Sequence, residues 1–205
     1  MYRWSPNLAY AIGLITTDGC LSKDGRHIDL TSKDLQQIEN FKRILKLSNK
    51  IGIKIRGTEP KLSYYRVQFG NVKFYRFLVS LGLSPHKSNT IKKVKIPDRY
   101  FTDFLRGCLD GDGCTFSFFS KKWQKSLVFY MSFASGSLFF LEWIKKSIDR
   151  LYGAKGAIWK QVKSGFQLRY AKKASIILIS KMYYSGGVIC LERKRSKIRT
   201  SLGII

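Results

Sequence analysis

The sequence predicts an α+β protein in which one structural unit occurs twice, and three observations support this prediction. A nine-residue segment recurs 94 residues further along the chain, the same order of helical and strand periodicity follows each copy, and 44% of the 205 residues are hydrophobic. A chain of this length and apolar content can fill a core without disulfides. We therefore expect two related halves, each an antiparallel sheet with helices on one face.

The repeated segment is an apolar stretch that ends in Asp-Gly. AIGLITTDG, residues 11–19, recurs as LRGCLDGDG, residues 105–113. An internal repeat of this kind indicates that one structural unit occurs twice in the chain. The apolar character of each copy predicts a helix, and the final glycine is suited to ending it.

Two glycines and two aspartates correspond between the copies. Gly13 and Gly107 would let the two helices pass in backbone contact. Asp18 and Asp112 stand at the C-terminal ends of their helices, where the helix dipole disfavours a negative charge. Two carboxylates that lie close together repel each other unless cations lie between them. Carboxylate oxygens suit Mg²⁺, which is commonly bound by one or two carboxylates together with substrate phosphates. Such ions can activate water at a phosphodiester, so we expect the two aspartates to converge at a metal site.

The first half continues with strands and helices whose periods can be read directly. In chain order, we expect a short strand near 20–22, a strand at 27–31, a helix at 33–47, strands at 50–57 and 63–69, and a helix at 71–82. Ile51, Ile53 and Ile55 are expected to point inward.

The second half repeats this order. We expect a strand at 127–133, a helix at 138–148, a strand at 166–170 and a final helix at about 172–184. The closing segments HKSNTI (86–91) and RKRSKI (193–198) also match loosely. A Pro- and Lys-containing linker at 84–99 then divides the chain into halves 1–83 and 100–205, each with the order αββαββα.

The charge of the chain points to a polyanionic partner. Its 38 Lys+Arg residues against 13 Asp+Glu give a net charge of +25 and a pI near 10.1. The basic residues lie among aromatic and β-branched ones, which indicates a folded basic surface. No membrane-spanning apolar stretch or secretory leader is evident, so we expect a soluble intracellular protein of the cytoplasm or an organelle matrix. Without C-x-x-C pairs, the four cysteines are expected to be reduced core or near-core thiols and not zinc ligands.

The strand alternation also predicts which residues face the nucleic acid on the open side of each sheet. Arg and Gln can make bidentate contacts to base edges, and Lys can contact phosphates. The expected DNA-binding residues are Lys54, Arg56, Tyr64, Arg66 and Gln68 in the first half, and Tyr130, Gln161, Lys163, Gln167 and Arg169 in the second.

The two motif copies resemble the signature helices of a monomeric LAGLIDADG homing endonuclease, since each keeps five of the nine letters. The resemblance implies two αββαββα halves that form a saddle of two antiparallel sheets over DNA, with the motif helices packed at the interface. It also implies cleavage of both strands of a long duplex target with short 3′ overhangs, using divalent metal ions, Mg²⁺ or Mn²⁺.

The family's functional residues map onto matching positions here. The resemblance assigns the metal-ligating catalytic acids to Asp18 and Asp112, and the basic residue near each scissile phosphate to Lys87 and Lys194. Arg195 and Lys33 are further candidates for DNA contact. The first copy has Thr16 where the second has Asp110, an earlier acid position that is not the central ligand.

Several alternatives stay open at this point. The same scaffold could serve as an RNA-splicing maturase that binds intron RNA, or as a non-cleaving DNA-binding protein, although retention of both aspartates argues against either as the sole function. An intein-embedded nuclease is disfavoured because the chain begins at Met1 without flanking splicing segments. We therefore expect a free-standing or intron-encoded monomer, and no membrane role, since no amphipathic helix carries a concentrated basic face.

Overall fold

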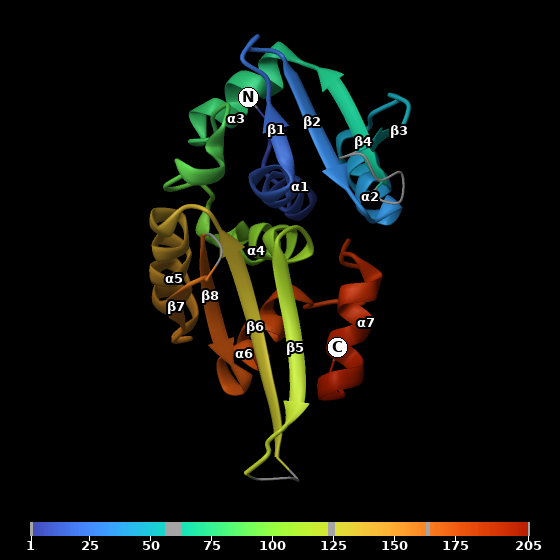
Figure 1. Ribbon diagram of the computed structural model, residues 1–205. Coiled ribbons are helices and arrows are strands. Elements are labelled where there is room, and N and C mark those ends of the chain that lie inside the picture. Colours follow the sequence, from blue (N-terminus) through green and yellow to red (C-terminus); the bar gives the residue numbers. More distant parts are fainter. Residues whose placement is uncertain (1, 56–62, 123–125, 163–164, 205) are drawn as a thin grey trace. The chain divides into compact units, whose positions relative to one another are not determined.

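The computed structural model describes residues 2–55, 63–122, 126–162 and 165–204 (Figure 1). The chain divides into two compact units, Met1–Lys87 with Val94–Gly111 and Ser88–Lys93 with Asp112–Ile205. Within the described residues, each unit contains one four-stranded antiparallel sheet. The predicted α+β class with two antiparallel sheets is confirmed.

The first unit contains the first motif helix, a sheet, two flanking helices and the second motif helix. Its helices and strands are α1 (Pro6–Thr17), β1 (Gly19–Leu21), β2 (His27–Ser32), α2 (Leu35–Leu45), β3 (Gly52–Ile55), β4 (Ser63–Gly70), α3 (Val72–Ser80) and α4 (Phe101–Asp110). Short 3₁₀ turns at Lys87–Asn89 and Asp98–Tyr100 lie between α3 and α4.

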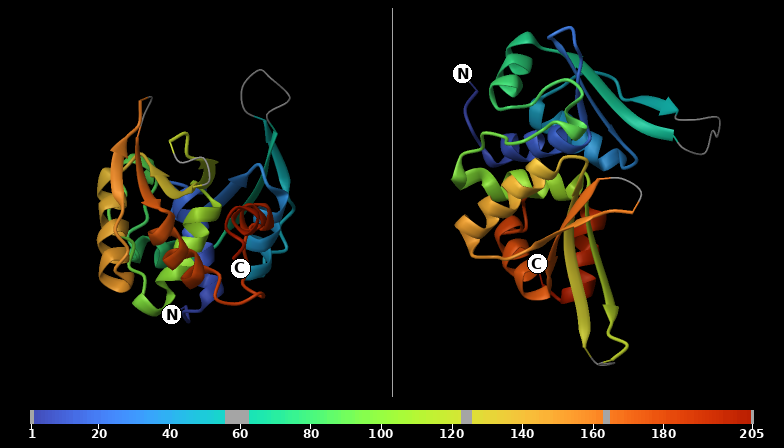
Figure 2. Two further views of the ribbon diagram at one scale, coloured as in Figure 1. Left: turned by 90° about the horizontal axis from the view of Figure 1, so that it is seen from below. Right: turned by 60° about the vertical axis from the view of Figure 1, so that its left-hand side comes forward.

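Helix α1 is a central core element of this unit. Ser5 begins it by accepting a hydrogen bond from the Leu8 amide at 3.1 Å, with Pro6 at the first helical position. Every residue from Leu8 to Thr16 is buried, which is typical of a helix enclosed on all sides. Helix α4 lies beside α1 (Figure 2). Because the two helices are in close contact, the second motif copy belongs to the first unit.

The first sheet has the strand order β1-β2-β4-β3. Its covered face carries Ile28, Leu30 and Val67, all fully buried and packed with α2. The inward placement predicted for Ile53 and Ile55 is wrong as far as burial is concerned, because these side chains are 69% and 64% exposed. They share a face with Val67 by strand parity but lie beyond the cover that α2 provides.

The second unit repeats the order of strands and helices and adds one element. It contains β5 (Gly113–Phe119), β6 (Leu127–Ser135), α5 (Leu138–Tyr152), β7 (Ala157–Lys160), β8 (Phe166–Ala171), α6 (Lys172–Met182) and α7 (Glu192–Leu202). The sheet order is β5-β6-β8-β7, and α5 and α6 both pack on β6 and β8 (Figure 1). Helix α7 was not predicted; it packs along the edge strand β5.

The strand registers define equivalent positions in the two sheets. Cys20 lies opposite Asp29 in the first sheet, and Cys114 lies opposite Ser132 in the second. Since Cys20 and Cys114 follow the two motifs at the same distance, Asp29 and Ser132 are equivalent. The same registers make the following positions of the two sheets equivalent: Arg66 and Gln167, Gln68 and Arg169, and Phe69 and Tyr170. Lys54 and Gln161 are equivalent as well, because the Gln161 amide donates to the Gly165 carbonyl directly beyond β7.

The cysteines divide into two kinds. All four are free thiols; Cys108 and Cys190 are buried, as predicted, whereas Cys20 and Cys114 are exposed. The prediction of near-core positions is therefore wrong for the latter two, because strand parity places them on the open faces of their sheets. Among the described residues, no helix is long and apolar enough to cross a membrane.

Candidate metal and nucleic-acid site

The two motif helices approach each other to backbone contact. A Cβ added to Gly13 would stand 2.3 Å from the Phe104 carbonyl oxygen, and one added to Gly107 would stand 2.2 Å from that of Tyr10. No side chain fits at either place, so the glycine at this position of each copy is required by the helix contact. The predicted close packing of the two helices is confirmed.

A buried polar network from α4 stabilises this contact. Arg106 is fully buried and forms an ion pair with Asp103 at 2.8 Å, and its guanidinium lies 5.4 Å from the centre of the Tyr10 ring. The Tyr10 hydroxyl donates to Asp110 Oδ2 at 2.8 Å, and Asp110 is 1% exposed. These contacts give Asp110, the earlier acid of the second motif, a structural role in the helix pair.

Asp18 is the half-buried residue that ends α1. Its backbone amide continues the helical pattern by donating to the Leu14 carbonyl at 2.9 Å. The carboxylate accepts a hydrogen bond from the side-chain amide of Gln37, with 2.6 Å between Nε2 and Oδ2. Gln37 comes from α2 and is 1% exposed. Gln37 was not predicted as a site residue; the signal for it in the sequence is a polar residue at a position of α2 next to its apolar face.

Asp112 begins the second unit's main segment and is exposed. It lines a hollow of about 540 Å³ whose other walls come from the β6–α5 corner, the β7–β8 turn and the segment near residue 89. The lining residues are Asn89, Asp112, Ala134, Ser135, Gly136, Gln161 and Gly165. The acid therefore opens onto a polar surface depression that includes Gln161, a predicted DNA contact.

The two candidate lysines occupy matching places in their own units. Lys87, which is 5% exposed, donates from Nζ to the carbonyl of Gly19, the residue after Asp18. Lys194 donates from Nζ to the carbonyl of Gly113, the residue after Asp112, at 2.8 Å. In each unit the structure thus brings one ammonium group to the backbone next to one motif aspartate.

The donor chemistry at both aspartates fits a hard divalent cation. Each unit offers a carboxylate at the end of its motif, and Mg²⁺ is commonly held by one or two carboxylates with substrate phosphates and water completing the shell. Across the described ranges, no cluster of three or more His, Cys, Asp or Glu side chains could hold a metal. A pre-formed cage of zinc or calcium type is therefore not the kind of site found in this part of the chain.

The open face of the first sheet carries most of its predicted DNA contacts. Lys54, Tyr64 and Arg66 share that face by register with Gln68. Arg66 forms an ion pair with Asp29 at 3.1 Å, so one of the predicted contacts is held by a carboxylate on the same face. The exposed Lys33 lies with its Nζ 5.5 Å from the centre of the Tyr64 ring. The predicted contact Arg56 lies outside the described residues.

The open face of the second sheet carries a connected set of side chains. Arg169 donates to Gln167 Oε1 at 2.9 Å, and Gln167 donates to Ser132 Oγ at 3.0 Å. The Arg169 guanidinium lies 5.4 Å from the Tyr130 ring and 5.2 Å from the Phe116 ring, which sequence analysis had not singled out. The predicted contact Lys163 lies outside the described residues.

Arg195 differs from the other candidates because it is buried. Its guanidinium donates to the Gly186 carbonyl at 3.0 Å and pairs with Glu192 at 3.4 Å, and only 7% of the residue is exposed. It also lies over the ring of Tyr183 at 5.9 Å. These contacts favour a structural role in holding α7 over a DNA contact.

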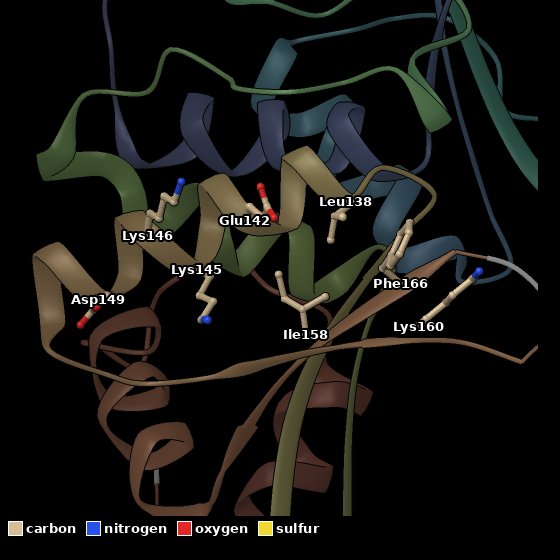
Figure 3. Close-up of a pocket in the computed structure, with 8 residues that line it drawn as sticks. All are labelled: Leu138, Glu142, Lys145, Lys146, Asp149, Ile158, Lys160 and Phe166. Atoms are coloured by element: carbon tan, nitrogen blue, oxygen red, sulfur yellow. The ribbon is translucent and has the colours of Figure 1, made fainter.

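A second hollow of about 500 Å³ lies on the helix-covered side of the second sheet (Figure 3). Its walls are one side of α5, with Glu142, Lys145 and Asp149, and the edge of the sheet at Ile158 and Phe166. None of the predicted site residues lines it. The mixed charges and the position away from the open face separate it from the candidate site.

Comparison with known proteins finds a family-model match within the first half and a similar fold for the whole chain. Residues 5–82 match the family described as a LAGLIDADG-like domain. No curated protein sequence matches the chain. The predicted resemblance is confirmed by this match together with the two-repeat fold of the structures below.

Three solved structures illustrate the fold. Full-length WhiA from Thermatoga maritima aligns with a TM-score of 0.60 and 14% identity over 100% of this chain, which spans 64% of that protein. The homing endonuclease I-WcaI, bound to its DNA recognition sequence, aligns with a TM-score of 0.64 and 14% identity, covering 97% of this chain and 88% of that one. A variant of I-DmoI, in complex with its target DNA in the presence of Mn, aligns with a TM-score of 0.57 and 16% identity, covering 88% of this chain and 95% of that one. Another I-DmoI variant was determined with its target DNA in the presence of Mg.

Proposed function

We propose that the protein is a site-specific DNA endonuclease that cuts both strands of a long duplex, because residues 5–82 match a LAGLIDADG-like domain and the whole chain shares the fold of LAGLIDADG homing endonucleases. The observation that carries this proposal is that a carboxylate and an ammonium group occur at matching places in the two units. In each unit a motif aspartate is followed by a glycine whose carbonyl accepts a hydrogen bond from a lysine, Lys87 or Lys194. A purely structural repeat would not need both charges in both copies.

Each of these groups has a distinct proposed role. Asp18 and Asp112 would hold the divalent cations, Mg²⁺ or Mn²⁺, and such ions would supply an activated water and stabilise negative charge on the phosphodiester oxygens. Lys87 and Lys194 balance the charge that develops on the phosphate. Because an ammonium group carries three donors, the bond to the glycine carbonyl fixes the position of the amine without neutralising its charge.

The open sheet faces provide the proposed DNA-reading surface. Arg66 and Gln68 in the first sheet and Gln167 and Arg169 in the second are held in defined positions on strands, which suits contact with base edges. The net charge of +25 supplies the phosphate attraction that a long site requires. Arg56 and Lys163 stay in the proposed set from the sequence pattern alone. We also keep as proposals the intron-encoded, monomeric character and the halves 1–83 and 100–205 about the linker 84–99.

Two alternatives use the same scaffold without cutting. The WhiA structures are described by a LAGLIDADG domain and not as an endonuclease, so a non-cleaving DNA-binding protein is the second candidate. An RNA-splicing maturase that binds intron RNA is the third. The retained carboxylate in both motifs favours the nuclease, because a carboxylate at the C-terminal end of a helix gains nothing from the dipole there.

Cleavage selection from a random duplex library tests the proposal. The purified protein with Mg²⁺ is expected to cut a small subset of duplexes, and Asp18→Asn and Asp112→Asn are each expected to abolish double-strand cutting while leaving DNA affinity within a few fold. Undiminished cutting by either variant would refute the role of that aspartate. Sequence-specific binding of duplex without cutting would support the WhiA-like alternative, and tight binding to RNA alone would support the maturase.

A further inference from the structure

Among the described residues, the position of the second half that is equivalent to Gln37 holds a side chain that cannot make the contact that Gln37 makes with Asp18. Gln37 lies three residues after Asp34, the N-cap of α2. Register places Ser32 and Ser135 at equivalent positions, so Asp34 corresponds to Ser137, the N-cap of α5, and Gln37 corresponds to Phe140. A phenyl ring cannot donate a hydrogen bond, and Phe140 is itself buried against Trp143 with ring centres 5.7 Å apart.

The burial of Gln37 shows that this contact is specified and not incidental. A side-chain amide that is 99% covered costs free energy unless its polar atoms are paired, and here the paired group is a carboxylate. At 2.6 Å the hydrogen bond to Asp18 Oδ2 is short, as expected for a charged acceptor. The helix α2 that carries Gln37 is anchored to α1 and to β2, so the donor stands on a rigid element.

We propose that Gln37 is a positioning residue that orients the Asp18 carboxylate toward its cation, and that the two metal-binding halves are therefore inequivalent. The inference rests on the proposed function, since it requires that Asp18 binds a divalent ion. Partners that orient a ligating carboxylate typically account for about ten- to a hundred-fold in metal affinity or activity. Only the Asp18 half receives an amide from this position of the second helix.

A double-mutant cycle on metal binding tests the proposal without relying on cleavage. Mn²⁺ affinity of the full-length, DNA-free protein is measured by electron paramagnetic resonance of the free ion, for the parent and for Gln37→Met. Methionine keeps the length and flexibility of the side chain and removes only the amide. The expected result is a loss of about tenfold in Mn²⁺ affinity in the parent background, and a change of less than about twofold when Asp18 is already replaced by Asn.

Phe140→Leu is the matched control at the equivalent position of the second half. It is expected to leave Mn²⁺ affinity unchanged in both backgrounds, because no hydrogen bond is lost. Gln37→Leu repeats the measurement with a second apolar residue, so that poor folding of one variant, judged by circular dichroism, does not decide the result. An equal loss of affinity with Asp18 and with Asn at position 18 would overturn the proposal, because the effect would then not pass through the Asp18 carboxylate.

Strand-resolved cleavage supplies a second readout. With each strand of a selected target labelled at one end, Gln37→Met is expected to slow one strand by about tenfold more than the other, so that nicked product accumulates. Equal slowing of both strands would contradict the inequivalence. If Asp18→Asn does not weaken Mn²⁺ binding at all, the proposed function itself fails. If it does and Gln37→Met does not, only the role of Gln37 is overturned.

Discussion

In the first sheet the middle of the open face holds an ion pair, whereas the equivalent two positions of the second sheet hold a hydrogen bond between neutral side chains. Asp29 pairs with Arg66 at 3.1 Å, and at the same two register positions Ser132 accepts from Gln167 at 3.0 Å. Because the backbone ladders correspond residue by residue, the difference arises from side chains alone. One repeated framework can thus present two chemically different surfaces, as recognition of an asymmetric duplex requires.

The edges of the two sheets differ in the same way. Strand β1 has three residues, and Lys87 from a 3₁₀ turn donates to its Gly19 carbonyl. Strand β5 has seven residues, and α7 runs along it with Lys194 donating to Gly113 and Lys197 donating to Thr115. An edge strand exposes unpaired carbonyls along its whole length, so the longer edge is covered by a whole helix.

The paired motif helices are unlike in polarity although their glycines match. Helix α1 buries an apolar set, whereas α4 buries Arg106 with Asp103 at positions that correspond to Ile12 and Ala9 in the repeat. A buried ion pair has a high desolvation cost, so its contribution is seen mainly when one member is removed.

Arg106→Met is expected to lower the free energy of unfolding by about 3–5 kcal/mol, because it leaves the Asp103 carboxylate buried without its ion-pair partner. The measurement is urea denaturation of the full chain at neutral pH. Arg106→Ile combined with Asp103→Ala installs the residues of the first copy and is expected to recover most of this loss. A single variant no less stable than the double variant would show that the ion pair does not hold α4.

Gly13→Ala and Gly107→Ala are expected to cost about 3 kcal/mol each, at the upper end of the range for overpacking, since each new methyl group meets a backbone carbonyl. The two variants should lose similar stability, because the added Cβ atoms would stand 2.3 and 2.2 Å from backbone carbonyl oxygens. Gly186→Ala is the control; its added methyl group would meet no atom within 4 Å. Tolerance of either motif substitution in thermal unfolding would mean that the helices do not make backbone contact.

Lys87→Met and Lys194→Met compare the two candidate ammonium groups. Both are expected to reduce cleavage by about a hundredfold, as loss of a charge that stabilises the reacting phosphate would. Their stabilities should differ: about 1–3 kcal/mol is lost for the buried Lys87, whose carbonyl partner is left unpaired, and less for the half-buried Lys194, where water can replace the amine. Full activity of either variant, measured on a selected target, would remove that lysine from the proposed site.

The repeat and the periodicity of apolar residues predicted the helices and strands that have a continuous apolar face. They did not predict elements with few buried residues, or exposure that depends on how far a neighbouring helix extends. Helix α7 escaped prediction because only Arg195 and Ile198 of its eleven residues are buried, which leaves no apolar period. The exposure of Ile53 follows from the extent of α2 and not from strand parity, so the pattern of β3 alone could not reveal it.

The residues of the candidate site that belong to the repeated motif were predictable from the sequence. Asp18 and Asp112 follow from the repeat in the sequence, and the family resemblance adds Lys87 and Lys194 from the loosely matching closing segments. Gln37 could not be found that way, because its partner lies nineteen residues away and the second copy has an apolar residue in its place. Departures from the repeat are visible only once the register equates the positions.

Tyr170 offers the mildest test of the comparison, because the first half has Phe69 at the equivalent position. Tyr170 is fully buried, and no partner for its hydroxyl is found among the residues that the structure describes. Burial raises the pKa of this phenol above its ordinary value. Tyr170→Phe is therefore expected to leave the free energy of unfolding unchanged or to raise it by up to about 1 kcal/mol, because an unpaired buried hydroxyl stabilises nothing.

The stability difference between Tyr170→Phe and the parent should also depend on pH. The unfolded chain ionises its tyrosines above about pH 10, whereas Tyr170 in the folded protein stays neutral, so the parent loses stability as the pH rises past that value. The advantage of Tyr170→Phe should then widen between neutral pH and about pH 11 in urea titrations. Phe69→Tyr is the reciprocal variant and should cost about 1–3 kcal/mol by burying a new hydroxyl. A Tyr170→Phe protein that is clearly less stable at neutral pH would mean that the hydroxyl is bonded, and that the two cores differ in chemistry as well as in sequence.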